Sequence, residues 1–205
     1  MRIGSLVGCF LFAIVCWAGA AAKKASGDYE KLLERVKSGD KTVDFRELRL
    51  AYADSPGFDR GPDTDPQKKG MWDALNSKDF ATAIKNADTV LASDYVDMDA
   101  HFAEYVAHRE LNEADLAEFH KFVLDGLLKS ITDSGDGKTP ETAMQVIEVH
   151  EEYVLLRHLG VGLPGSQSLL HKDGHSYDEI KYLDPDSKQE VTIYFNVDIP
   201  FKHYP

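Results

Sequence analysis

The sequence predicts an α+β protein, with tetratricopeptide-like helical hairpins first and a small antiparallel β/α part at the C-terminal end. Three observations predict this class: apolar residues recur at helical spacing over residues 28–131, a glycine-rich turn follows at 134–137, and apolar and polar residues alternate at 191–197. Because no low-complexity or proline-rich linker divides the chain, we expect one α+β domain over residues 23–205, with its β-rich part at 140–199.

Residues 1–22 have the layout of a secretory signal peptide. One arginine precedes an apolar run over residues 3–17, and small residues follow at 18–20. The run ends before the roughly 20 apolar residues that a membrane-spanning helix needs. We therefore expect cleavage after Ala20 or Ala22 and a periplasmic or secreted mature protein without a membrane span. An uncleaved anchor is the alternative.

The composition excludes several classes of protein. The formal net charge is −12, and removal of the leader with its arginine makes it −13 (−12 − 1). So acidic a chain is a poor partner for nucleic acid or for anionic membranes. Both cysteines, Cys9 and Cys16, lie in the leader, so the mature chain has neither disulfides nor thiol chemistry.

The first helices are predicted from periodicity and from capping residues. A helix over residues 28–36 carries apolar residues on one face, and Asp44 is placed to cap a second helix. Residues 55–66 are rich in proline, glycine and aspartate and form a loop, whose aspartates lack the spacing of an EF-hand. At its end we expect Asp65 to cap the next helix, with Pro66 as the first helical residue.

Residues 71–131 show one helical pattern after another. Residues 79–84 resemble the opening of the second helix in a tetratricopeptide repeat, and Ala117 follows Ala83 at the period of that repeat (117 − 83 = 34). Hairpins of this kind bury one face and present the other as a groove. For the last helix, over residues 113–131, we expect these core residues: Leu116, Phe119, Val123, Leu127 and Leu128.

One helix in this part carries a possible metal-ligand set. His101, Glu104 and His108 lie three and seven residues apart and so share a helix face, and two imidazoles with a carboxylate can bind zinc. The same helix carries larger apolar residues that predict a core face of its own: Phe102, Tyr105 and Val106. Packing and hydrogen bonding at the margin of that face explain the histidines, so we predict no metal ion and no cofactor.

The C-terminal part begins after the turn at 134–137, whose glycines favour the positive φ values that end helices. We expect a buried strand over 143–149 and a short helix over 151–159. The alternating segment 191–197 pairs with 177–183 in a hairpin.

The standard catalytic motifs are incomplete in this chain. His150 and Glu151 begin the zinc-protease string, but Val154 stands where the second histidine is needed. Residues 165–168 lack the spacing of a nucleophile elbow, and the glycine-rich turn lacks the first glycine of a P-loop. We therefore assign no catalytic residue, and the binding residues stay open.

A set of short motifs is spread over most of the chain. Its members are Ser134, Gly135, Asp136, Gly137 and Lys138, then Glu141, Thr142 and Ala143, then Glu152 and Tyr153, Gln167 and Ser168, and finally Tyr194, Phe195 and Asn196. These motifs resemble those of a family of secreted bacterial proteins, the domain of unknown function family 4919. The resemblance implies a helical, tetratricopeptide-like front and a small β end, with the motif residues in structural roles. It implies no catalytic residue, cofactor or substrate.

Three hypotheses of function follow. The first is an extracytoplasmic, non-catalytic interaction module that holds a peptide or protein on the helical surface of residues 71–131. The second is a hydrolase or metal-dependent enzyme of unrecognised type, built from these residues: His101, Glu104, His108, His150 and Glu152. The third is a structural subunit whose partner is its own copy. We favour the first, with no nucleic-acid partner, and the oligomeric state stays open.

Overall fold

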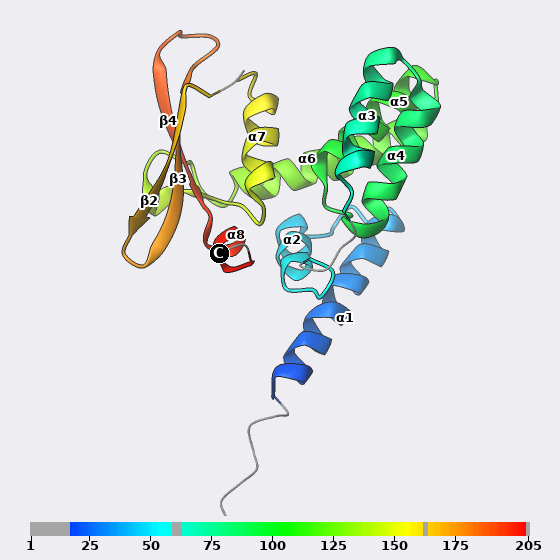
Figure 1. The fold of residues 1–205 in the computed structure, drawn as a ribbon. Helices are drawn as coiled ribbons and strands as arrows, with labels where there is room; N and C mark the ends of the chain where they lie inside the picture. Colours follow the sequence, from blue (N-terminus) through cyan, green and yellow to red (C-terminus); the bar gives the residue numbers. More distant parts are fainter. Residues whose placement is uncertain (1–16, 59–62, 162–163, 204–205) are drawn as a thin grey trace, which may run out of the picture.

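The computed structural model describes residues 17–58, 63–161 and 164–203, with side chains from residue 27 onwards. Most of the predicted leader, both cysteines and Asp59 lie outside these ranges. Helices occupy the first part of the chain and a small sheet the last part, which confirms the α+β class (Figure 1). Within the described ranges, every helix is too short or too polar to cross a membrane.

The helical part contains α1 to α6 (Figure 1). Their bounds are α1 (Trp17–Lys37), α2 (Phe45–Ala53), α3 (Asp65–Ser77), α4 (Phe80–Ser93), α5 (Met98–Glu110) and α6 (Ala114–Thr132). Short connections join α3 to α6, and each helix in this run packs against the next, while α2 packs against α1 and α6. Fully buried residues from several of these helices, such as Leu48, Met71 and Leu127, belong to one continuous core.

Aspartate side chains begin three of these helices. Asp44 accepts hydrogen bonds from two backbone N–H groups in the first turn of α2, as the sequence predicted. Asp79 and Asp97 accept from the first turns of α4 and α5 in the same way. Each cap satisfies amides that have no partner within the helix, so these boundaries are determined locally.

Two other helix starts differ from the prediction. Helix α1 is described from Trp17, whereas the pattern placed its start at residue 28. Five of the eleven added residues are alanine, which favours a helix without any apolar stripe. Helix α3 has Thr64 as its N-cap, so Asp65 is its first helical residue, not its cap. A proline is equally acceptable at either of the first two helical positions, which is why Pro66 did not determine this boundary.

The C-terminal part is a four-stranded sheet with helices beside it (Figure 1). Its elements are a 3₁₀ turn (Pro140–Thr142), β1 (Met144–Gln145), α7 (Val149–His158), β2 (Ser166–Lys172), β3 (His175–Leu183), β4 (Glu190–Asn196) and α8 (Asp198–His203). The strand order is β1-β4-β3-β2. The predicted β3–β4 hairpin is confirmed, with Ile180 opposite Ile193 and both buried. Strand β1 pairs parallel to β4, so the sheet is mixed and not wholly antiparallel.

The strand expected over residues 143–149 is much shorter than predicted. Strand β1 covers Met144 and Gln145, Val146 adds one backbone hydrogen bond to Asn196 of β4, and Val149 is already the first residue of α7. The backbone N–H of Ile147 donates to the Glu151 carboxylate over 2.8 Å instead of continuing the ladder. A β-branched, apolar stretch predicts burial, and Ile147 is indeed buried, but it does not predict where the chain turns from strand to helix.

The core face expected for α6 is confirmed at its C-terminal end only. Val123, Leu127 and Leu128 are buried and Phe119 is half-buried, but Leu116 is 47% exposed. Leu116 lies in the first turn of α6, next to the connection at which the neighbouring α5 ends. Periodicity placed Leu116 on the same stripe as Val123 and Leu127, but in the first turn of α6 the buried residue is Ala117.

The glycine-rich turn joins the end of α6 to the sheet. Ser134 Oγ donates to the carbonyl of Ile131 and accepts from the N–H of Gln145. Gly137 has a φ of +66°, and its carbonyl accepts from the N–H of Tyr194 in β4 over 2.8 Å. A Cβ at Gly137 would lie 2.8 Å from Ile193 Cγ1, so this position needs glycine for its backbone and for the space.

A buried ion pair connects the helical part to the C-terminal part. Arg49 of α2 and Glu151 of α7 are both buried, and Arg49 binds both carboxylate oxygens, the Nε–Oε1 distance being 2.9 Å. The same guanidinium donates to Ser130 Oγ in α6 and to the Gln145 carbonyl in β1. One side chain thus contacts α6, β1 and α7 at once.

We predict that Arg49→Met destabilises the fold by about 3–5 kcal/mol, because it leaves the Glu151 carboxylate buried without its cation. The measurement is the free energy of unfolding in urea. Adding Glu151→Gln should recover a large part of the loss, since the amide keeps an acceptor for Ile147 but carries no charge. Arg46→Met is the control, because Arg46 lies on the same helix but is exposed. Equal losses at the two arginines would contradict this account.

We predict that Gly137→Val lowers the free energy of unfolding by roughly 1–3 kcal/mol, because valine is strained at positive φ. Its side chain would also collide with Ile193. Lys138→Val, which places the same side chain on an exposed residue of the same turn, should change stability by less than about 0.5 kcal/mol. Urea unfolding of both variants measures the difference, and a Gly137→Val protein as stable as the wild type would refute the role of this turn.

Candidate functional site

Helix α5 buries a polar face. His101 and Glu104 are 0% and 1% exposed and His108 is 8% exposed, whereas Phe102 is 37% exposed. The expected core face of larger apolar residues is therefore wrong, and the half-buried Tyr105 lies outside the core as well.

The alanines of α5 explain this reversal. Ala100, Ala103 and Ala107 are 0% exposed and lie on the same face as the buried histidines. Such small side chains allow the neighbouring helices to approach closely and leave the remaining space to imidazole and carboxyl groups. Apart from Met98 in the first turn, the buried face therefore consists of the smallest and the most polar residues of the helix.

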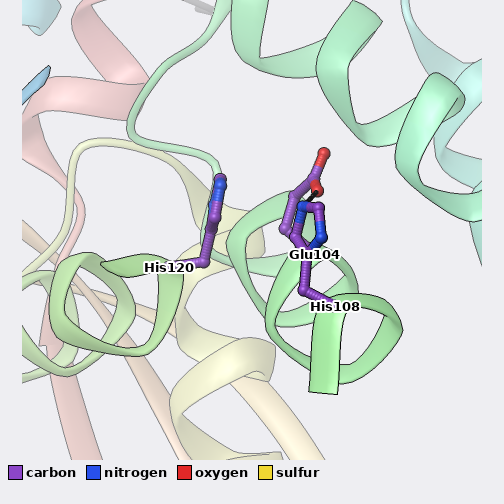
Figure 2. A group of neighbouring side chains, drawn as sticks. All are labelled: Glu104, His108 and His120. Carbon is purple, nitrogen blue, oxygen red and sulfur yellow. Dashed lines mark ion pairs between the residues drawn. The ribbon is translucent and has the colours of Figure 1, made fainter. Parts of the chain in front are cut away.

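Glu104 and His108 of α5 and His120 of α6 form a cluster, in which one ligand atom from each residue lies within 4.8 Å of the others. Figure 2 shows His120 opposite the pair formed by Glu104 and His108. His108 Nε2 lies 3.0 Å from Glu104 Oε2, and His108 Nδ1 lies 2.6 Å from Glu113 Oε2. The sequence predicted a set of His101, Glu104 and His108. The structure brings Glu104 and His108 together, but the third member of the cluster is His120 and not His101. His101 lies behind His120, with 3.1 Å between their Nδ1 atoms.

Hydrogen bonding assigns the tautomers of two imidazoles. The backbone carbonyl of Tyr95 can only accept, so His101 Nε2 must donate to it over 2.9 Å. In the neutral ring His101 Nδ1 is then an acceptor, and His120 Nδ1 donates to it. This leaves the lone pair of His120 on Nε2, which is free for another ligand.

Burial disfavours the charged forms of Glu104, His101 and His120. It raises the pKa of Glu104 to about 8, with a further contribution from the negative charge of Asp88. Burial also lowers the pKa of His101 to about 4 and that of His120 to about 3. Glu104 Oε1 is buried and has no hydrogen-bond partner in the part of the chain that the structure describes. The cluster thus combines a neutral imidazole, that of His120, with a carboxyl group that is not fully satisfied.

A pocket of about 290 Å³ lies between the helical part and α7. Its lining residues come from α3, α5, α6 and α7: Trp72, Asp99, Phe102, Leu124, Leu128, Val154, Arg157 and His158. The Trp72 and Phe102 rings lie 5.8 Å apart, and the Arg157 guanidinium lies 5.7 Å from the centre of the Trp72 ring. The lining is mostly apolar with a few charged groups, as is usual for a binding pocket.

Asp99 contacts two basic side chains beside this pocket, His150 and Arg157. It is 4% exposed, forms an ion pair with Arg157, and accepts from His150 Nε2 over 2.9 Å. Burial opposes ionisation of Asp99, but His150 and Arg157 together lower its pKa, and the Asp99 hydrogen bond raises the pKa of His150. His150, one of the candidates for an enzyme, is thus held by its hydrogen bond to Asp99.

A second group of carboxyl side chains surrounds Lys68. Lys68 Nζ lies 2.8 Å from Asp97 Oδ2. Burial, together with Glu148 and Asp97, raises the pKa of Asp94 well above its usual value. Burial and then Glu151 raise the pKa of Glu148 to about 6. These groups join α3, the α4–α5 connection and the start of α7.

Glu152 of α7 is fully buried against the sheet. Burial, and then the neighbouring carboxylate of Asp178 in β3, raise its pKa to about 9. Gln167 of β2 donates to Asp178 over 2.6 Å, and the Tyr153 hydroxyl donates to Gln167. Glu152, the other enzyme candidate, is therefore protonated at neutral pH and lies between α7 and the sheet, apart from the histidine cluster.

The remaining sequence motifs lie in two structural groups. Those of residues 134–143 build the turn on β4, and those at Glu152, Tyr153 and Gln167 join α7 to β2 and β3. A family model described as a domain of unknown function, DUF4919, matches residues 20–205. The chain belongs to this family. Comparison with curated proteins and with solved structures finds no match.

Sequence reasoning missed several site residues of this DUF4919 protein. His120 could have been found from the hairpin geometry, because Glu104 and His120 are each eight residues from Asn112 in the α5–α6 connection (112 − 104 and 120 − 112). Residues equally distant from the turn of a helical hairpin lie opposite each other. Trp72, Asp99 and Arg157 carried no such signal, since they come from helices that are distant in the sequence.

We predict that Glu152→Gln reduces the pH dependence of stability. The pKa of Glu152 rises from about 4.5 in the unfolded chain to about 9 in the fold, so between these values unfolding releases its proton and stability falls as pH rises. The loss amounts to about 1.4 kcal/mol per pH unit for one proton. Glutamine cannot release this proton. Between about pH 6 and pH 8 the free energy of unfolding of the variant should therefore fall less steeply with pH than that of the wild type, by that amount.

Urea unfolding at a series of pH values measures this slope. Glu118→Gln is the matched control, because Glu118 is exposed on α6, and it should leave the slope unchanged. An unchanged slope in Glu152→Gln would show that Glu152 is ionised in the folded protein.

Proposed function

We propose that this DUF4919 protein is an exported, non-catalytic interaction module that holds a segment of a partner protein in the pocket between α3, α5, α6 and α7. The partner segment carries one large apolar side chain with basic residues beside it. The pocket carries this proposal, because it is concave, mostly apolar and of a size for one or two side chains.

The lining residues support an anchor of this kind. Trp72 and Phe102 form an aromatic wall, and Phe102 is among the exposed large apolar residues of the protein. Aromatic residues in a desolvated pocket are the usual centre of a binding hot spot. Arg157 is held against Trp72 by Asp99, so the pocket wall is ordered before a partner binds.

The charge of the chain supports the choice of a basic partner. At a net charge of −12 the protein attracts cationic segments at long range, which speeds association with them and disfavours acidic partners. Three of the four helices around the pocket, α3, α5 and α6, belong to the run α3–α6, which is the part with the tetratricopeptide-like pattern. Proteins of that class bind partners on the exposed face of such hairpins.

The predicted leader supports a site of action in the periplasm or outside the cell. The N-terminal segment of residues 1–22 has the charge, apolar run and small residues of a cleaved leader, so the mature protein acts in the periplasm or outside the cell. Cleavage after Ala20 or Ala22 also removes Trp17. Because the chain has two tryptophans, Trp72 is then the single tryptophan of the mature protein.

Site-specific photocrosslinking in the native envelope identifies the partner. A photoreactive residue at position 102 should capture a partner segment with an apolar residue and neighbouring basic residues, as read by mass spectrometry. The same residue at position 201 is the control, since Phe201 is also 37% exposed but lies on α8. Equal capture at both positions, or capture of residues 177–197 of the same chain alone, would refute the pocket as the binding site.

A synthetic peptide of the captured segment then tests the pocket directly. Its binding should change the fluorescence of Trp72, and Phe102→Ala should weaken it by about tenfold or more, the effect of losing a hot-spot residue. Leu183→Ala is the matched control, because Leu183 is an exposed apolar residue of β3. A peptide that binds both variants with equal affinity would contradict the proposal.

A further inference from the structure

We propose that Glu104, His108 and His120 bind a divalent transition-metal ion, with zinc as the best match, and that the ion joins α5 to α6. The observation that carries this proposal is the convergence of three ligand atoms within 4.8 Å of one another in a largely buried cluster (Figure 2). It rests on residues outside the pocket and is independent of the proposed partner binding. It also replaces the expectation from the sequence that the chain binds no metal ion and that packing explains the histidines.

The donor atoms point to this class of metal. Two imidazoles with one carboxylate are a common set for zinc, whereas magnesium and calcium prefer oxygen ligands alone. Zinc bonds of about 2.0–2.1 Å place tetrahedral ligands roughly 3.4 Å apart. The separation of up to 4.8 Å is thus closed by small rotations of the Glu104 and His120 side chains.

Hydrogen bonds hold both imidazoles for a metal. His120 Nδ1 donates to His101, which is held in turn by the carbonyl of Tyr95, so the lone pair of His120 is on Nε2. His108 Nδ1 lies 2.6 Å from a Glu113 oxygen and donates to it, which places the lone pair of His108 on Nε2. A partner on the second ring nitrogen is the arrangement that orients metal-binding histidines in proteins.

Glu104 supplies the second, independent indication. Its Oε2 faces the Nε2 lone pair of His108 at 3.0 Å, which is favourable only with a proton or a cation between the two atoms. Its other oxygen, Oε1, is buried without a hydrogen-bond partner among the described residues. A metal ion would satisfy the carboxylate and both imidazoles together. Asp88 and Glu113 add negative charge close by, which favours a cation.

Metal titration of the chelator-treated mature protein tests the site. Co²⁺ should give visible absorption bands that saturate at one ion per chain, and Zn²⁺ should displace it. Zinc should also raise the midpoint of thermal unfolding by about 3 °C or more, because an ion that binds the fold alone stabilises it. No absorption band at millimolar Co²⁺, together with an unchanged midpoint in zinc, would overturn the proposal.

Substitutions assign the ligands. Glu104→Gln and His120→Gln, which keep size and remove one ligand each, should each weaken binding by about 100-fold or more. His101→Phe should weaken it by about 10-fold to 100-fold, since it removes the group that orients His120 without touching the metal. His171→Gln is the control, because His171 is exposed on β2, and it should bind like the wild type.

Circular dichroism checks that each variant is folded, and the titration of the wild type tests the proposal even where a variant is not. Wild-type stoichiometry that persists in both Glu104→Gln and His120→Gln would show that the ion binds elsewhere and would overturn the assignment. Loss of binding in His171→Gln alone would do the same.

Discussion

The buried pair of Arg49 and Glu151 is the interaction on which the rest of the structure depends. The guanidinium contacts α6 and β1 as well as α7, so it determines how the C-terminal part sits on the helical part. A buried charge pair of this kind contributes little net free energy compared with apolar residues, but losing one partner is costly. The pair of Arg49 and Glu151 therefore acts mainly by disfavouring other positions of α7 against the helical part, in which one of the two charges would be buried alone. The pocket depends on it directly, because Val154 and Arg157 of α7 form one wall.

Helix α5 contributes to both candidate sites from opposite sides. Its buried face supplies Glu104 and His108 to the cluster with α6, and its exposed Phe102 and nearby Asp99 line the pocket. The two sites make different use of polar groups. Around the pocket, opposite charges are paired and stay ionised. In the histidine cluster, burial disfavours charge, and the groups have lone pairs without enough protons to satisfy them, which is the condition that a metal ion relieves.

Predictions from the sequence succeeded where one segment contains all the interacting groups. Asp44 immediately precedes α2 and caps its first turn. The alternation over residues 191–197 places Ile193 and Phe195 on the buried face of β4. They were wrong where burial or the end of an element depends on contacts with another element. Leu116 lies on the predicted stripe of α6, but in its turn the neighbouring elements cover Ala117 instead. The strand before α7 ends early, where the Glu151 side chain accepts the hydrogen bond of the Ile147 backbone.

The sequence by itself determined that helices precede the sheet, the hairpin of β3 and β4, the glycine-rich turn, the charge and the family, because each depends on local spacing or on composition. It did not determine which residues meet. Apolar size predicted that α5 would bury Phe102, but its alanines allow close helix packing, so the fold buries His101 and Glu104 instead. His120 completes the cluster from the facing helix, and Trp72 meets Arg157 across the pocket. Such contacts are decided by the packing of elements that are distant in the chain, because no single segment contains both of the residues that meet.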